Sequence, residues 1–211
     1  MTDSGIDLII LILSELEQNT IRGRLKLHKL LFLLLKEAGL ENFEDEFSFG
    51  PYKFGPWSPV VDSYLELLED NGIIKIESIP NDTYECFEIN DNSLIDTYTL
   101  TVVGIKVGEQ LEKLYKEQLY GLKKILNTYS RLSNHTLLRY LYTNYPRFKE
   151  KSIVKEQVPN LTPLEEFKIS FPDEEIDEEL FSFVGIIPKI SRSEEKEVLD
   201  KIILGMNNDI C

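Results

Sequence analysis

Apolar side chains recur with helical spacing near the start of the chain. Residues 7–19 are apolar at nearly every position from Leu8 to Leu13, which is typical of a helix buried on most sides. A second helix is predicted over residues 25–38, with a leucine stripe on one face and Gly39 at its end. Its other face is expected to carry Lys26, Lys29, Lys36 and Glu37.

Large rings and two Gly-Pro steps mark residues 47–59. The alternation from Phe47 to Phe49 predicts a short strand that leads into a sharp turn, because proline fixes φ and holds the preceding glycine extended. Ser58 is predicted as the N-cap of a helix and Pro59 as its first residue. The apolar spacing then predicts a helix over 60–71 that ends at Gly72.

Two runs rich in β-branched and aromatic residues, 73–79 and 84–89, are separated by a turn signal and predict a hairpin. A third strand is expected over 98–101, and Thr101 is expected to cap a helix that extends to about residue 115. Further helices are predicted within 113–133 and over 135–145, the latter capped by Ser133 and Asn134.

This order predicts a mainly α fold with a small β-hairpin, in which a winged helix-turn-helix-like domain is followed by a helical C-terminal extension. The expected parts are a winged-helix-like domain over 1–105, a basic helical extension over 106–158, and an acidic linker over 159–211. The last part is expected to include a docked strand over 181–188 and a final helix capped by Ser193.

The charge of the chain argues against general binding to nucleic acid. Lys and Arg number 23 against 37 Asp and Glu, a net charge of -14 that repels a phosphate backbone. The helix over 60–71 occupies the recognition position of a winged helix-turn-helix, yet it has no Lys or Arg. Because its polar face carries four acidic side chains, DNA reading by this helix is disfavoured. These side chains are Asp62, Glu66, Glu69 and Asp70.

The middle of the chain has the opposite charge. Residues 101–155 hold 11 Lys or Arg and 4 Asp or Glu, with aromatic residues between the basic ones. Such interleaving can bind single-stranded nucleic acid by stacking and charge. The favoured interpretation is instead a helical face that docks the acidic tail or a partner. The candidate nucleic-acid-binding residues are Lys123, Lys124, Arg131, Arg139, Arg147 and Lys149.

Catalytic and metal-binding motifs are not evident. The sequence lacks a nucleophile elbow, Walker-type glycines, HExxH and paired Cys and His ligands, so we expect no enzyme activity, no cofactor and no metal site. His28 and His135 are the only histidines, and a packing or surface role is favoured for His28. Cys86 and Cys211 indicate no disulfide framework, and no signal peptide or membrane span is predicted, so a reduced, cytoplasmic protein is expected.

Three segments together resemble a known family. Residues 27–34 (LHKLLFLL), residues 52–59 (YKFGPWSP) and the run from Tyr98 to Gly104 are similar to YwgA-like proteins and the Panacea (SocA-like) antitoxin domains, over about residues 24–105. The resemblance implies a small, winged-helix-like domain that acts by protein binding, by neutralising a toxin or adapting it to a protease, sometimes in phage defence. His28 stands where that pattern has glutamine.

The leading hypothesis is a non-enzymatic protein-binding module whose partner is a toxin or a defence component. Rigid aromatic side chains at the Gly-Pro turn would serve as interface anchors, although packing in the core is an equal alternative for them. The expected partner-binding residues are Tyr52, Lys53, Phe54, Trp57, Asp62 and Glu66. The alternatives are a nucleic-acid-binding regulator that uses residues 106–155 and an acidic mimic of DNA. The apolar stripe of the final helix leaves a homodimer open.

Overall fold

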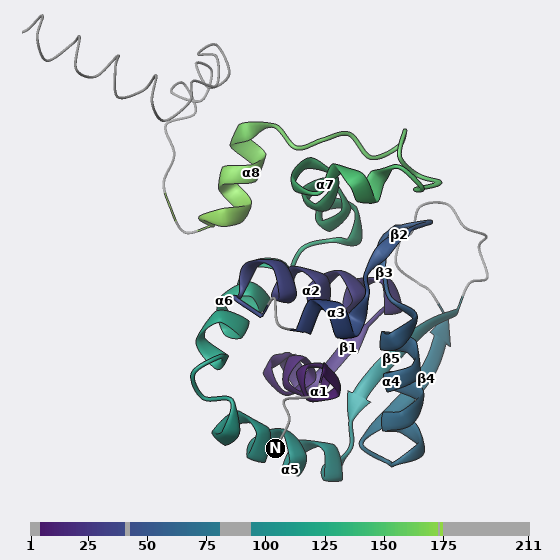
Figure 1. Ribbon diagram of the computed structural model, residues 1–211, viewed down its shortest axis with the longest axis vertical. Coiled ribbons are helices and arrows are strands. Elements are labelled where there is room, and N and C mark those ends of the chain that lie inside the picture. The colour runs from purple at the N-terminus through teal and green to yellow at the C-terminus, as the bar shows by residue number, and fades with distance from the viewer. Residues whose placement is uncertain (1–4, 41–42, 81–93, 173, 175–211) are drawn as a thin grey trace, which may run out of the picture. The chain divides into compact units, whose positions relative to one another are not determined.

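Figure 1 shows the protein as a computed structural model, which describes residues 5–40, 43–80, 94–172 and 174. The chain forms two compact units, one that ends at Leu161 and one that begins at Thr162. The described part of the first unit is mainly helical and contains two small antiparallel sheets. A mainly α fold with little β-structure is therefore confirmed, whereas the three-part division at residues 105 and 158 stays a prediction.

Two buried helices form the centre of the first unit. α1 (Gly5–Glu15) buries every residue from Leu8 to Leu13, and a short 3-10 helix, η1 (Glu17–Asn19), follows it. α2 (Arg24–Glu37) buries every residue from 27 to 35. Both helices were predicted, but α1 ends four residues earlier than expected because Leu16 has an extended backbone with φ -86° and ψ 152°.

The larger sheet has the strand order β1-β5-β4, with β5 (Leu94–Leu100) in the centre. Its neighbours are β1 (Thr20–Arg22) and β4 (Ile74–Pro80), both antiparallel to it. β4 confirms the predicted strand over 73–79, and β5 begins four residues before the expected third strand. The predicted hairpin partner over 84–89 lies outside the described residues. β1 was not predicted, since three residues carry little sequence signal.

A compact insertion separates α2 from α4 (Pro59–Asp70). It contains a one-turn helix, α3 (Glu44–Phe47), and a hairpin of β2 (Gly50–Tyr52) and β3 (Gly55–Trp57). The strand predicted over 47–49 is wrong. Phe47 ends α3 and Ser48 has a left-handed conformation with φ 48°, because acidic side chains in the first turn favour a helix here.

Three further helices lie against α1 and α2 (Figure 1). They are α5 (Val102–Leu114), α6 (Leu119–Tyr129) and α7 (Asn134–Asn144), and the 3-10 helix η3 (Pro146–Lys149) follows α7. Two predicted caps are confirmed. Thr101 Oγ1 accepts a hydrogen bond from the Gly104 amide at 3.1 Å, and Ser133 Oγ accepts one from the Thr136 amide at 3.1 Å.

One carboxylate joins α2 to α6 and α7. Glu37 Oε2 accepts a hydrogen bond from the Tyr129 hydroxyl at 2.7 Å, and Glu37 Oε1 accepts one each from the hydroxyls of Tyr140 and Tyr145, both at 3.1 Å. Bonds to an ionised acceptor are stronger than bonds between neutral groups. Glu37, which was expected on an open polar face, therefore holds three helical segments together.

The described part of the second unit consists mainly of α8 (Pro163–Ser170). The side chain of Thr162 and that of Glu165 form a capping box, which fixes the start of this helix. α8 was not predicted, although Thr162, Pro163 and Glu165 are its start signal. Residues 173 and 175–211 of the expected acidic linker lie outside the described residues, and the predicted docked strand and final helix belong to this part. None of the described helices has the length and apolar character needed to cross a bilayer.

Candidate functional site

The hairpin β2–β3 is the most distinctive surface feature of the insertion. Tyr52 pairs with Gly55, so only Lys53 and Phe54 connect the two strands. Gly55 has a φ of +92°, and a Cβ atom there would lie 3.3 Å from Leu138 Cδ2 of α7. The tip is also held from the side, because the Ile153 amide donates a hydrogen bond to the Lys53 carbonyl at 3.0 Å. The hairpin is thus fixed to the body of the first unit.

The base of the hairpin rests on α2 through a pair of stacked rings. The imidazole of His28 and the indole of Trp57 are nearly parallel, with centroids 3.8 Å apart and an angle of 8°. Arg24 lies one helical turn before His28, and its guanidinium carbon is 5.1 Å from the centre of the Trp57 ring. Residues that are 33 and 29 positions distant along the chain therefore set the orientation of the tryptophan.

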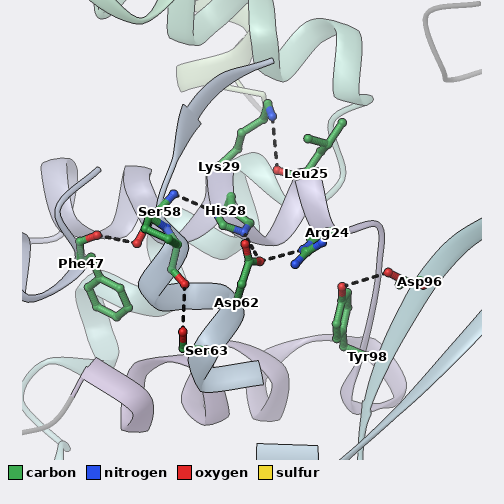
Figure 2. Close-up of polar contacts among 11 residues, drawn as sticks. Arg24, Leu25, His28, Lys29, Phe47, Ser58, Asp62, Ser63, Asp96 and Tyr98 are labelled. Carbon is green, nitrogen blue, oxygen red and sulfur yellow. Dashed lines mark hydrogen bonds and ion pairs between the residues drawn. The ribbon is translucent and has the colours of Figure 1, made fainter. Parts of the chain in front are cut away.

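Asp62 in α4 connects Arg24 and His28, as Figure 2 shows. Its Oδ1 atom accepts hydrogen bonds from Arg24 Nε at 2.7 Å and from His28 Nε2 at 3.2 Å. The Ser58 amide donates to His28 Nδ1 at 3.3 Å. This donor assigns the ring proton of neutral His28 to Nε2, the atom that faces Asp62. Helix α2, the hairpin and the start of α4 are thereby joined by one polar network.

The network is arranged around a neutral histidine. Burial holds the pKa of His28 below its usual value of 6.5, against the opposing hydrogen bond to Asp62. Partial burial by itself would raise the pKa of Asp62, but hydrogen bonds from His28 and Arg24 keep this pKa below its usual value. The arrangement therefore contains an ionised carboxylate, a guanidinium and an uncharged imidazole, all with structural partners.

Ser58 was correctly predicted as the residue before the helix, but its side chain has another role. Its hydroxyl donates to the Phe47 carbonyl and makes no capping bond to α4. The Ser58 side chain therefore ties the start of α4 back to the end of α3. Since the Ser58 amide also binds His28, this residue fixes the insertion from both sides.

Lys29 was expected on the polar face of α2, and this prediction is wrong. Its side chain is fully buried, and its Nζ atom contacts the Leu25 carbonyl at 3.4 Å. Burial lowers the pKa of Lys29 to about 7. The error has a physical cause, since α2 is covered on nearly its whole circumference and leaves this side chain no path to solvent.

A groove lies along one side of the hairpin, with a volume of about 280 Å³. Its walls are mostly apolar, and Arg24 and Lys53 contribute the charged groups. The side chain of Arg24 is 44% exposed, and Lys53 is exposed. The lining residues are Arg24, Leu25, Tyr52, Lys53, Phe54, Gly55, Pro56 and Trp57.

The structure brings most of the expected partner-binding residues together. Tyr52, Lys53, Phe54 and Trp57 line one groove, with Tyr52 48% exposed. Phe54 and Trp57 are half-buried. Asp62 does not line the groove, but it accepts a hydrogen bond from Arg24, which does. Glu66 is exposed one helical turn further along α4.

Several of the candidate nucleic-acid-binding residues have contacts within the first unit. Arg139 donates to the carbonyls of Pro159 and Asn160, both at 3.1 Å, and Lys149 Nζ donates to Asn160 Oδ1 at 3.2 Å. Lys123 pairs with Glu15 at 3.1 Å. The guanidinium carbon of Arg147 lies 4.6 Å from the Phe148 ring centre. Lys124 and Arg131 are exposed.

The aromatic residues between these basic positions do not form an exposed stacking surface. Four of the five are buried, so their rings belong to the core of the first unit; they are Tyr129, Tyr140, Tyr142 and Phe148. The fifth, Tyr145, is half-buried, and its hydroxyl donates to Glu37. A nucleic-acid-binding role at these positions would therefore depend mainly on the basic side chains. Within the described ranges, no group of three His, Cys, Asp or Glu side chains could hold a metal ion.

Comparison with protein-family models, with curated proteins and with solved structures found no match.

Sequence reasoning missed two residues that shape the site. Arg24 was not singled out, and His28 was assigned a packing or surface role without its contacts to Trp57 and Asp62. Their spacing of four residues places both on the same face of α2, which was the available signal. The sequence alone did not indicate that this face meets the base of the hairpin.

Proposed function

We propose that this protein is a non-enzymatic protein-binding module and that hairpin β2–β3 carries its binding surface. The observation that carries the proposal is a half-exposed Tyr52 at the tip of a hairpin fixed to α2, α7 and the segment after η3. An aromatic side chain that is already held in place loses little conformational entropy on binding. Tyrosine and tryptophan are also enriched at the energetic centres of protein interfaces.

A second exposed apolar residue extends this surface. Ile153 is 62% exposed, and its amide is bonded to the Lys53 carbonyl at the hairpin tip. Tyr52, Phe54 and Ile153 therefore provide apolar contact area from two segments about 100 positions apart. A rigid apolar centre with Lys53 at its edge is a usual composition for an interface.

We further propose that residues 5–100 form a variant of the winged helix. The order of α1, β1, α2, α4, β4 and β5, together with the sheet order β1-β5-β4, supports this proposal. In a helix-turn-helix the two helices are joined by a turn of about 3–4 residues. Here α3 and the hairpin are inserted between α2 and α4, and the proposed binding surface lies on that insertion.

The resemblance to YwgA-like and Panacea (SocA-like) domains suggests the biological setting, an antitoxin-like or phage-defence regulator that binds a partner protein. The matched segment 52–59 contains six of the eight groove residues, those from Tyr52 to Trp57. We propose a toxin or another defence component as the partner on that basis.

The test is purification of the tagged full chain from its source organism, followed by mass spectrometry and the absorbance ratio that reports nucleic acid. We expect one other protein to be recovered with the unmodified chain in a near-equal amount. This protein should not be recovered with the Tyr52→Ser variant. Tyr120→Ser is the matched control, because Tyr120 in α6 is 81% exposed and belongs to no described part of the groove. Equal recovery with Tyr52→Ser, or nucleic acid without a protein, would contradict the proposal.

A further inference from the structure

We propose that the groove beside hairpin β2–β3 binds an acidic peptide segment, with a carboxylate next to Arg24 and Lys53 and a large apolar side chain on the aromatic wall. This inference rests on the proposed protein-binding function and names the chemistry of the segment that the surface accepts. Three features of the groove support it, namely its size, its charge and the geometry of its arginine.

The groove is small and open, which suits the side chains of a peptide. Pockets for small-molecule ligands span about 300–1,000 Å³ and enclose most of the ligand. This groove has a volume of about 280 Å³ and is open to solvent along the hairpin. Leu25, Phe54 and Trp57 offer an apolar surface for one or two side chains.

The charge of the groove is opposite to the charge of its surroundings. Residues 1–100 contain 7 Lys or Arg and 19 Asp or Glu. Two of those seven cations line the groove, and no acidic residue does. Within residues 1–100, whose other charges are mostly acidic, the groove therefore offers attractive groups to an acidic segment.

The arginine has a defined orientation. Asp62 accepts a hydrogen bond from Arg24 Nε, and the indole of Trp57 lies beside the guanidinium. A guanidinium has five N–H donors, so this bond to Asp62 uses one of them. The two terminal nitrogens match a carboxylate in the paired geometry that arginine favours. Asp62 thus positions Arg24 and also offsets part of its charge, which leaves Lys53 to supply attraction at the open end.

The test begins with a phage-displayed library of random eight-residue peptides, selected on the immobilised full chain. We expect enrichment of Asp or Glu within two positions of Leu, Ile, Phe or Trp. Lys53→Glu should abolish this preference, whereas Lys124→Glu on α6 should retain it. Both lysines are exposed, so neither substitution disturbs the core.

Binding is then measured with an enriched peptide and its glutamine isostere. The only tryptophan of the chain, Trp57, lines the groove, so its fluorescence reports occupancy directly. We expect the isostere to bind about tenfold more weakly, which corresponds to about 1.4 kcal/mol, and the difference to shrink as salt is added.

Three results would overturn the inference: enrichment of neutral or basic peptides, equal selection by Lys53→Glu, or no enrichment at all. If one of these results is obtained and a partner protein still requires Tyr52 for binding, the preference for acidic peptides is rejected. The proposed protein-binding function is then retained. Enrichment of acidic peptides without a Tyr52-dependent partner would reject the proposed function separately.

Discussion

The imidazole of His28 lies flat against the indole of Trp57, 3.8 Å from it, while its two nitrogens contact Ser58 and Asp62. Both nitrogens are engaged in the neutral ring, with Nδ1 as acceptor and Nε2 as donor. Protonation of His28 would place a hydrogen on Nδ1 where it faces the Ser58 amide. The hairpin base is therefore built for the uncharged histidine.

His28 should make the fold sensitive to mild acid. Its pKa is lowered from 6.5 in the folded protein, so the unfolded chain binds more protons as the pH falls below 6.5. The free energy of unfolding should thus decrease from neutral pH toward the lowered pKa. His28→Gln should reduce this dependence and cost about 2–3 kcal/mol at neutral pH, because it removes a buried ring. Urea unfolding at several pH values measures both effects.

The matched control is His135→Gln, which changes the only other histidine, an exposed residue. It should leave the pH dependence intact. An equal loss of pH dependence in both variants would contradict the assignment to His28.

Lys29→Met should stabilise the protein. The folded pKa of Lys29 is about 7 against 10.5 for the exposed group, so the unfolded chain binds more protons between these values. The cost of the buried amine is complete below pH 7 and declines as the pH rises. We expect a gain of about 1–3 kcal/mol at pH 6 and a smaller gain at pH 9.5, measured by denaturant unfolding. Lys124→Met, at an exposed position, should change little at either pH.

Glu37→Gln should loosen the contact of α2 with α6 and α7. The amide has one oxygen where the carboxylate has two. Its NH₂ group would face a tyrosine hydroxyl that donates a hydrogen bond to Glu37 in the unmodified protein. The expected cost is about 1–3 kcal/mol. Burial and then Glu37 raise the pKa of Tyr145, so this pKa should fall in the variant, as followed by NMR of labelled tyrosine. Glu66→Gln, on an exposed face, is the control, and an equal cost there would refute the assignment.

Gly104→Ala should destabilise the protein although alanine favours helices by about 1 kcal/mol. A Cβ atom at Gly104 would lie 2.1 Å from the Ile73 carbonyl oxygen, which belongs to the backbone and cannot rotate away. We expect a net cost of about 2–4 kcal/mol in thermal or urea unfolding. Gly50→Ala, where nothing lies within 4 Å, should be nearly neutral. A neutral Gly104→Ala would show that α5 can move away from Ile73.

The helical core could be predicted because its signals are local. The apolar runs of α1 and α2 and the caps at Thr101 and Ser133 act within one or two turns, so the sequence contains them directly. β1 could not be found in this way. Its three residues are a strand only because β5 lies beside them, with Thr20 opposite Thr99.

The same distinction holds for the candidate site. Turn signals predicted the position of Tyr52, Lys53, Phe54 and Trp57, but not that Gly50–Tyr52 and Gly55–Trp57 pair as strands. Arg24 and His28 contact Trp57 and Asp62, which lie about 30 positions later in the sequence. Such contacts depend on how the elements pack, so they leave no local signal. The requirement for glycine at position 104 likewise comes from the close approach of the Ile73 carbonyl, which lies about 30 positions away and has no local signal.

The anchoring of hairpin β2–β3 has an evolutionary consequence. Gly55, Trp57 and Ser58 make the contacts that hold the hairpin, whereas the side chain of Tyr52 is half-exposed and that of Lys53 is exposed. Mutations at these two exposed positions should therefore be tolerated by the fold, while under the proposed function they would alter which partner the surface binds. Such a division lets recognition diverge rapidly under selection, as in a contest between a host and its parasites, without a loss of foldability.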